Sequence, residues 1–134
     1  RDDTDSQAFA ALCLGTAYVY DCDIDNADKY LREAQSLASI SGNEDTLQST
    51  HISLGKLELL RRNLDAARKH FKQAGSMDRV SRSMEETAAE ALYWWAVVTR
   101  DHFKAKKGQK HLDMIMPAIK KFDIEHWLVP VPGI

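Results

Sequence analysis

A repeat with a period of 40 residues is the feature that most constrains how this 134-residue chain can fold. Segments 23–36 and 63–76 both begin with Asp or Asn, an aliphatic residue and Asp, and both carry Ala at their fifth position. In each copy a large apolar residue follows four positions later, and a second Ala three positions after that. Leu14-Gly15 matches Leu54-Gly55 at the same offset. A period of this length is typical of a supersecondary unit that buries its apolar face against neighbouring units.

Each copy has the pattern of two helices. Before the first turn, residues that would share one helix face recur at a spacing of three to four, at Phe9, Leu12, Gly15 or Thr16, and Val19. Asp23 and Asn63 are residue types that cap helix N-termini, and Gly42 is the type that ends a helix in the left-handed conformation. The sequence therefore predicts one helix that ends near residue 20 and others over about 24–41, 45–62 and 64–76.

Small residues stand where the two helices of each predicted hairpin would cross. Gly15 and Ala27 in the first copy correspond to Gly55 and Ala67 in the second. A larger side chain there would push the two helices apart, since the separation of packed helices depends on the side chains at the contact.

This pattern resembles the tetratricopeptide repeat family, in which Leu-Gly-x-x-Tyr is followed by Ala, Phe and Ala at fixed distances. The first copy supplies Leu14, Gly15, Tyr18, Ala27, Leu31 and Ala34. The second supplies Leu54, Gly55, Ala67, Phe71 and Ala74, with Glu58 in place of the tyrosine. The helix-ending proline of the family is replaced by Ser39 and Arg79. The long period is similar to that of the lengthened repeats of kinesin light chains and of certain cell-polarity adaptors.

The resemblance implies an all-α solenoid of about three antiparallel helix pairs. A third, weaker copy is placed at an offset of 41, with Trp95-Ala96 for the Leu-Gly pair and Gly108, Leu112 and Ile115 at the later positions. The implied repeat domain covers residues 1–123, with repeats at about 7–41, 45–80 and 84–121.

The segment 124–134 is predicted to leave the helical domain as an extended tail. Pro130 and Pro132 fix φ and bias the valines before them away from helix. Because Trp127, Leu128 and Val129 are apolar, we expect the tail to dock, either on the last helix or in a neighbour's groove.

Composition places the chain among ordinary globular proteins, with 44% apolar and 28% charged residues. No apolar run approaches the roughly 18 residues of a membrane span, so we expect no membrane contact. The two cysteines form no CxxC pair, and an intracellular location, cytoplasmic or nuclear, is expected. The first residue is Arg1 rather than Met, which indicates a piece of a longer protein.

The charge is distributed unevenly along the chain. Residues 1–67 carry 6 Lys and Arg against 12 Asp and Glu, whereas residues 68–134 carry 12 against 8. A basic half can contact nucleic acid. The lysines of this half are spread along predicted helix faces with acids between them, which favours solvated surfaces over a nucleic-acid site.

No set of residues has the spacing of a catalytic, cofactor or metal site. The five histidines form no HExxH or paired His and Cys cluster, and the phosphate-loop, dinucleotide and nucleophile-elbow motifs are absent. An acidic turn over residues 21–28 lacks the glycine and the terminal glutamate of a calcium loop. We expect a protein that is not an enzyme and needs no cofactor or metal.

What the family resemblance implies is a binding groove lined by the first helix of each pair. The implied groove residues are Leu12, Thr16 and Val19 in the first repeat, Ile52, Lys56 and Leu59 in the second, and Tyr93, Trp94, Val97 and Arg100 in the third. The cationic clamp with which some family members grip a C-terminal carboxylate is missing, since its positions hold Leu12, Thr16 and Tyr93. An alternative is that several of these residues pack against further repeats or pair two copies of the chain.

Two functional classes remain open. The leading one is a protein-interaction scaffold or adaptor that binds an apolar or amphipathic segment of a partner, with Tyr93 and Trp94 as main anchors. Trp94 is chosen over Trp95 because adjacent helical residues point about 100° apart and Trp95 takes the position between helices. The other is a regulatory sensor domain of a larger effector, whose basic half contacts nucleic acid or an acidic partner.

Overall fold

The computed structural model of the chain describes residues 2–78, 82–102, 105–123, 125, 128 and 130. These residues form six α-helices and no strand, which confirms the predicted all-α class. The helices are α1 (Asp2–Tyr20), α2 (Ile24–Ser41), α3 (Glu44–Leu60), α4 (Leu64–Gly75), α5 (Arg82–His102) and α6 (Ala105–Phe122).

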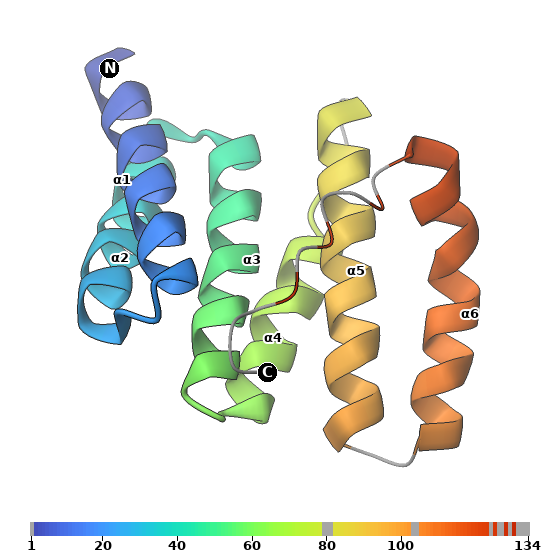
Figure 1. The fold of residues 1–134 in the computed structure, drawn as a ribbon. Helices are drawn as coiled ribbons and strands as arrows, with labels where there is room; N and C mark the ends of the chain where they lie inside the picture. Colours follow the sequence, from blue (N-terminus) through green and yellow to red (C-terminus); the bar gives the residue numbers. More distant parts are fainter. Residues whose placement is uncertain are drawn as a thin grey trace.

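Each helix packs against its neighbours in the sequence. α1 packs on α2, α3 on α4 and α5 on α6, and the contacts of α2 with α3 and of α4 with α5 join these pairs. Contacts also form between α1 and α3 and between α3 and α5. Figure 1 shows α1, α3 and α5 side by side, with α2 and α4 behind them. We call the surface formed by α1, α3 and α5 the odd-helix face.

The turns between α1 and α2 and between α3 and α4 repeat the same geometry at the 40-residue offset. The predicted caps Asp23 and Asn63 are confirmed, since each side chain accepts a hydrogen bond from the backbone N–H three residues later. Cys22 and Arg62, one residue before each cap, have φ values of 60° and 62°. Both residues end the preceding helix in the left-handed region, a position more often held by glycine.

The helix crossings also occur where the small residues predict them. A Cβ atom on Gly15 would lie 2.7 Å from the Leu31 side chain, and one on Gly55 would lie 2.5 Å from the Phe71 ring. The equivalence of Gly15 with Gly55 extends to their contacts, because Leu31 and Phe71 are themselves 40 residues apart. These two hairpins therefore cross in the same way.

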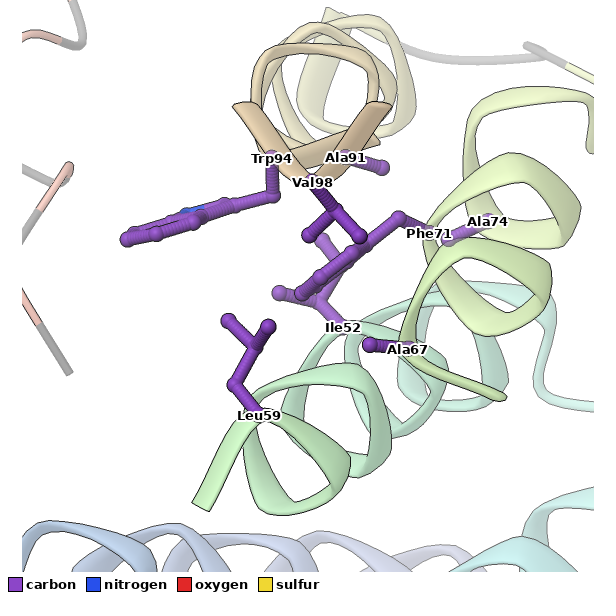
Figure 2. Packing of buried hydrophobic residues seen from close by; sticks show 8 residues of the cluster. All are labelled: Ile52, Leu59, Ala67, Phe71, Ala74, Ala91, Trp94 and Val98. Carbon is purple, nitrogen blue, oxygen red and sulfur yellow. The ribbon is translucent and has the colours of Figure 1, made fainter. Parts of the chain in front are cut away.

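Three apolar clusters run along the part of the molecule that the structure describes. The first lies between α1, α2 and α3, the second between α3, α4 and α5, and the third between α5 and α6. Figure 2 shows the second cluster, in which Ile52 and Leu59 of α3 point toward Phe71 of α4 and Val98 of α5. α3 takes part in two of these clusters, and its residues 50–59 are all buried.

The chain leaves α6 where the sequence predicts it. α6 ends at Phe122, and Asp123 has a φ of 54°. Most of the predicted tail lies outside the described residues. Of the residues that are described, Leu128 is partly buried and packs against the α5–α6 cluster, and Pro130 is exposed.

Candidate functional site

A lysine in the middle of the odd-helix face joins its three helices. The ammonium of Lys56, on α3, donates to the hydroxyl of Tyr20 on α1 at 2.9 Å and to Oε2 of Glu90 on α5 at 3.4 Å. It also lies 5.5 Å from the ring centroid of Tyr20 and 5.3 Å from that of Trp94, which is on α5. We call these four residues the Lys56 cluster.

The helical periodicity explains why these side chains meet. Glu90 and Trp94 are four residues apart on α5, so both project from the same side of that helix. Tyr20 stands four residues after Thr16, whose hydroxyl is hydrogen-bonded to that of Ser53 at 2.7 Å. Ser53 in turn precedes Lys56 by three residues. Two layers of polar contacts therefore connect α1 with α3 along this face.

The Lys56–Glu90 pair is nearly removed from water. The side chain of Lys56 is 7% exposed and that of Glu90 is 14% exposed. Burial raises the pKa of Glu90, and the adjacent Lys56 ammonium opposes this shift. Removing one member of a buried ion pair typically costs about 3–5 kcal/mol, since the other charge is left without compensation. The pair therefore fixes α3 and α5 relative to one another.

Among the described residues, two of the three N–H donors of the Lys56 ammonium have an acceptor. An ammonium carries three N–H donors. Tyr20 and Glu90 accept two of these hydrogen bonds, and no third acceptor is found among the residues that the structure describes.

Trp94 lies deeper than an exposed anchor would. It is 6% exposed and belongs to the cluster between α3, α4 and α5, where its ring stacks on Phe71 with centroids 6.1 Å apart. Figure 2 shows the indole extending from α5 to one side of Val98 and Phe71. Tyr93, which is partly exposed, meets Trp94 edge to face at 5.7 Å. Trp94 is thus part of the core beneath the odd-helix face, and the ring of Tyr93 is the more accessible of the two.

The other predicted groove residues divide into a buried and a partly exposed set. The buried residues, with 0–7% exposure, are Leu12, Val19, Ile52, Lys56, Leu59 and Trp94. The partly exposed residues are Thr16, Tyr93, Val97 and Arg100. The structure brings Lys56 and Trp94 together across the face. Leu12 and Val19 instead fill the cluster with α2 and α3, and Ile52 and Leu59 fill the one with α4 and α5.

Sequence reasoning did not include Tyr20 in the site. The sequence spacing could have identified Tyr20, because this residue is one helical turn after the predicted groove residue Thr16. Glu90 also lies on the predicted face, four residues before Trp94. Its pairing with Lys56 depends on the distance between α3 and α5, which a single sequence does not supply.

A second polar contact lies between α3 and α4, away from the Lys56 cluster. The Nδ1 atoms of His51 and His70 are 3.2 Å apart, and the two rings are tilted by 31°. Burial lowers the pKa of His51 to about 4, with further contributions from His70 and Arg32. Burial also lowers the pKa of His70. A neutral pair of this kind shares one N–H···N hydrogen bond.

Among the described residues, pockets open between α5 and α6 at two places. The larger has a volume of about 210 Å³, and its lining includes Ala89, Ile115 and Phe122. The smaller, of about 140 Å³, is lined by Leu92, Trp95, His111, Met114 and Ile115. Within the described ranges, no three His, Cys, Asp or Glu side chains come together in a way that would hold a metal ion.

The comparisons with known proteins gave no match to a family model, to a curated protein or to a solved structure. In the part of the chain that was searched, no helix combines the length and apolar character that crossing a membrane requires.

Proposed function

We propose that this chain is a protein-interaction domain of the tetratricopeptide-repeat kind, a scaffold or adaptor that binds an apolar or amphipathic segment of a partner on its odd-helix face. In this proposal the three helix pairs form a short α-solenoid, and the first helix of each pair contributes to the face. The supporting features are the two equivalent crossings at Gly15 and Gly55 and the side-by-side arrangement of α1, α3 and α5.

The observation that carries the proposal is the Lys56 cluster. A buried ammonium held by residues of three helices is expensive to maintain, and here it lies 5.3 Å from the ring centroid of Trp94, which meets the partly exposed ring of Tyr93 edge to face. An aromatic surface next to a single polar donor is the arrangement by which peptide-binding grooves hold a segment, with apolar side chains giving affinity and the polar group setting register.

Selection of peptides against the full chain tests the proposal. Twelve-residue peptides from a random display library are selected, and their affinity is then measured by fluorescence anisotropy. Tyr93→Ala should weaken binding at least tenfold, because truncating a central aromatic anchor costs about 2 kcal/mol or more. Ile40→Ala is the matched control, since Ile40 is 74% exposed on α2 rather than on the odd-helix face.

The two variants distinguish binding on the odd-helix face from binding elsewhere on the protein. Circular dichroism should show unchanged helix content in both variants. If the selected peptides lose affinity with Ile40→Ala and are indifferent to Tyr93→Ala, the binding surface is not the odd-helix face and the proposal fails. Trp94→Ala is a poorer test, because Trp94 lies in the core and its truncation is expected to destabilise the fold.

A further inference from the structure

α1 exposes apolar residues at positions that are buried in the next two odd-numbered helices. Ala10, Leu14 and Ala17 are spaced four and three residues apart, so they project from one side of α1, and all three are exposed. Forty residues later, the equivalent positions of α3 have 0% exposure and hold Thr50, Leu54 and Leu57. On α5, the offset of 41 leads to Ala91 at 0% and Val98 at 1% exposure. We call Ala10, Leu14 and Ala17 the α1 stripe.

The equivalent residues of α3 and α5 are covered by the helix pair that precedes each of these helices. Leu54 and Leu57 belong to one cluster with Leu31 of α2. Ala91 and Val98 belong to another cluster with Phe71 of α4, so an even-numbered helix packs on this side of both α3 and α5. Among the described residues, nothing covers the same side of α1, since the α1 stripe is exposed.

α6 is the even-numbered helix that packs on an odd-numbered helix at one side only. α2 packs on α1 and α3, and α4 packs on α3 and α5, whereas the main contacts of α6 are with α5. Gly75 of α4 lies against the odd-numbered helix that follows it, because a Cβ atom there would be 2.6 Å from the Leu92 side chain. The equivalent residue of α6 is Met116, which is only partly buried, and Lys120, one turn later, is exposed. Leu128 packs on the same cluster as Met116 and is itself only partly buried, so apolar surface remains accessible at this end.

α1 and α6 carry opposite charges. Between residues 2 and 20, α1 has three Asp and no Lys or Arg, whereas α6 has five Lys and one Asp between residues 105 and 122. Residues 42–43 alone join α2 to α3, so the end of α2 lies beside the beginning of α3. In the same antiparallel arrangement, Lys120 and Lys121 at the end of α6 would lie beside Asp3 and Asp5 at the beginning of α1. Complementary charges of this kind speed encounter and fix the register of a contact.

We propose that the chain associates head to tail with a second copy of itself, in which α6 of one copy lies antiparallel on the α1 stripe of the next. This contact repeats between copies the packing that α2 makes with α3, and α4 with α5, within one copy. It goes beyond the proposed function, because the α1 stripe corresponds to positions between helix pairs and not to the odd-helix face. A contact between two different surfaces leaves one of each free at the ends, so association continues beyond a dimer.

The charges disfavour a symmetric contact between two α1 stripes. An antiparallel pair of α1 helices would bring Asp3 and Asp5 of one copy near the C-terminal end of the other α1. The helix dipole is negative at that end, and Asp21 follows directly after the helix. α1 has no Lys or Arg that could offset this repulsion.

Sedimentation equilibrium of the full chain over a range of concentrations tests the proposal. The weight-average mass should rise with concentration past that of a dimer, and it should fall as NaCl is raised from about 50 to about 500 mM, because salt screens attraction between exposed charges. Leu14→Asp should weaken association by about tenfold or more, because it places a carboxylate without a partner in the apolar contact. Ala17→Glu is a second variant of the α1 stripe with the same expected effect. Ile40→Asp is the matched control and should associate as wild type does, since Ile40 is 74% exposed on α2.

A mixture of two variants distinguishes the head-to-tail contact from the symmetric one. Leu14→Asp keeps an intact α6, and the double variant Lys120→Glu with Lys121→Glu keeps an intact α1 stripe. Each protein alone should be monomeric. Their equimolar mixture should form a dimer and nothing larger, because one functional surface of each kind remains. Circular dichroism should show the same helix content in all variants, since every substituted residue is exposed.

A mass that stays that of the monomer at every concentration of wild type would overturn the inference. So would a double lysine variant that associates as strongly as wild type, because a symmetric contact between α1 stripes does not use these lysines. If Leu14→Asp loses helix content, Ala17→Glu replaces it in the mixture. None of these results bears on the proposed function, which the display-selected peptides test separately through Tyr93→Ala.

Discussion

The contact between His51 and His70 makes the stability of the fold depend on pH. His51 is 3% exposed, and its pKa is lowered to about 4 from its usual value of 6.5. Because the folded state binds the proton less readily, the unfolded state is protonated first as pH falls. The stability that the neutral pair contributes is present above pH 6.5 and is lost progressively below it.

We expect the free energy of unfolding to fall as pH drops from 6.5 toward 4, with a limiting slope of about 1.4 kcal/mol per pH unit for each of the two histidines. Urea denaturation at intervals of half a pH unit measures it. His51→Gln removes one of the two histidines with a lowered pKa and should reduce the slope between pH 6.5 and 5. An unchanged slope in this variant would show that other groups cause the acid sensitivity.

At the scale of single residues, the sequence predicted the conformation at some positions and not at others. The caps Asp23 and Asn63 were predictable, since capping depends on one side chain and the backbone three residues later. The left-handed residues Cys22 and Arg62 were not, because neither residue type favours a positive φ. Only the 40-residue offset between them shows that both turns have the same form.

At the scale of the helices, the crossing of α3 with α4 leaves no room for a side chain on Gly55. Gly55→Ala should destabilise the protein by about 1–3 kcal/mol through overpacking, because the new Cβ atom would lie 2.5 Å from the Phe71 ring. In an unconstrained helix the same change stabilises by about 0.5–1 kcal/mol, so the two expectations differ in sign. Chemical denaturation decides between them.

The matched variant is Phe71→Leu, which opens space beside the new methyl group. The double variant should be less destabilised than the sum of the two single changes. If Gly55→Ala raises the denaturation midpoint, the helices do not approach closely at this position.

The family resemblance implied a set of α3 residues that line a groove with α1 and α5, and it did not distinguish the buried members of that set from the exposed ones. α3 lies between two apolar clusters and contacts α1, α2, α4 and α5. Ile52 and Leu59 are therefore buried, although their spacing alone is equally typical of a binding surface. Burial depends on how closely neighbouring helices approach, and a single sequence does not encode that distance in any local pattern.

At the scale of the whole molecule, the main helix contacts are between elements one or two apart in sequence. The sequence repeat predicted the all-α class and the close approach at two crossings because both follow from residues within one period. The Lys56 cluster spans Tyr20 to Trp94, so it draws on three periods. Its assembly depends on how successive helix pairs stack. The repeat pattern predicts that the pairs stack, but it does not predict the distances between them.

Contacts between neighbouring helices also bear on the order in which parts of the protein can fold during synthesis. The buried members of the cluster between α1, α2 and α3 run from Ala11 to Leu57, so this core needs none of the residues that follow α3. A ribosome that has exposed α3 can hold a nascent chain whose first core is already closed while α5 is still being synthesised. Chains stalled just after α3 has emerged should resist brief proteolysis, and Leu31→Asp, at the centre of that core, should abolish the resistance. Rapid cleavage of both chains would show that folding waits for the later helices.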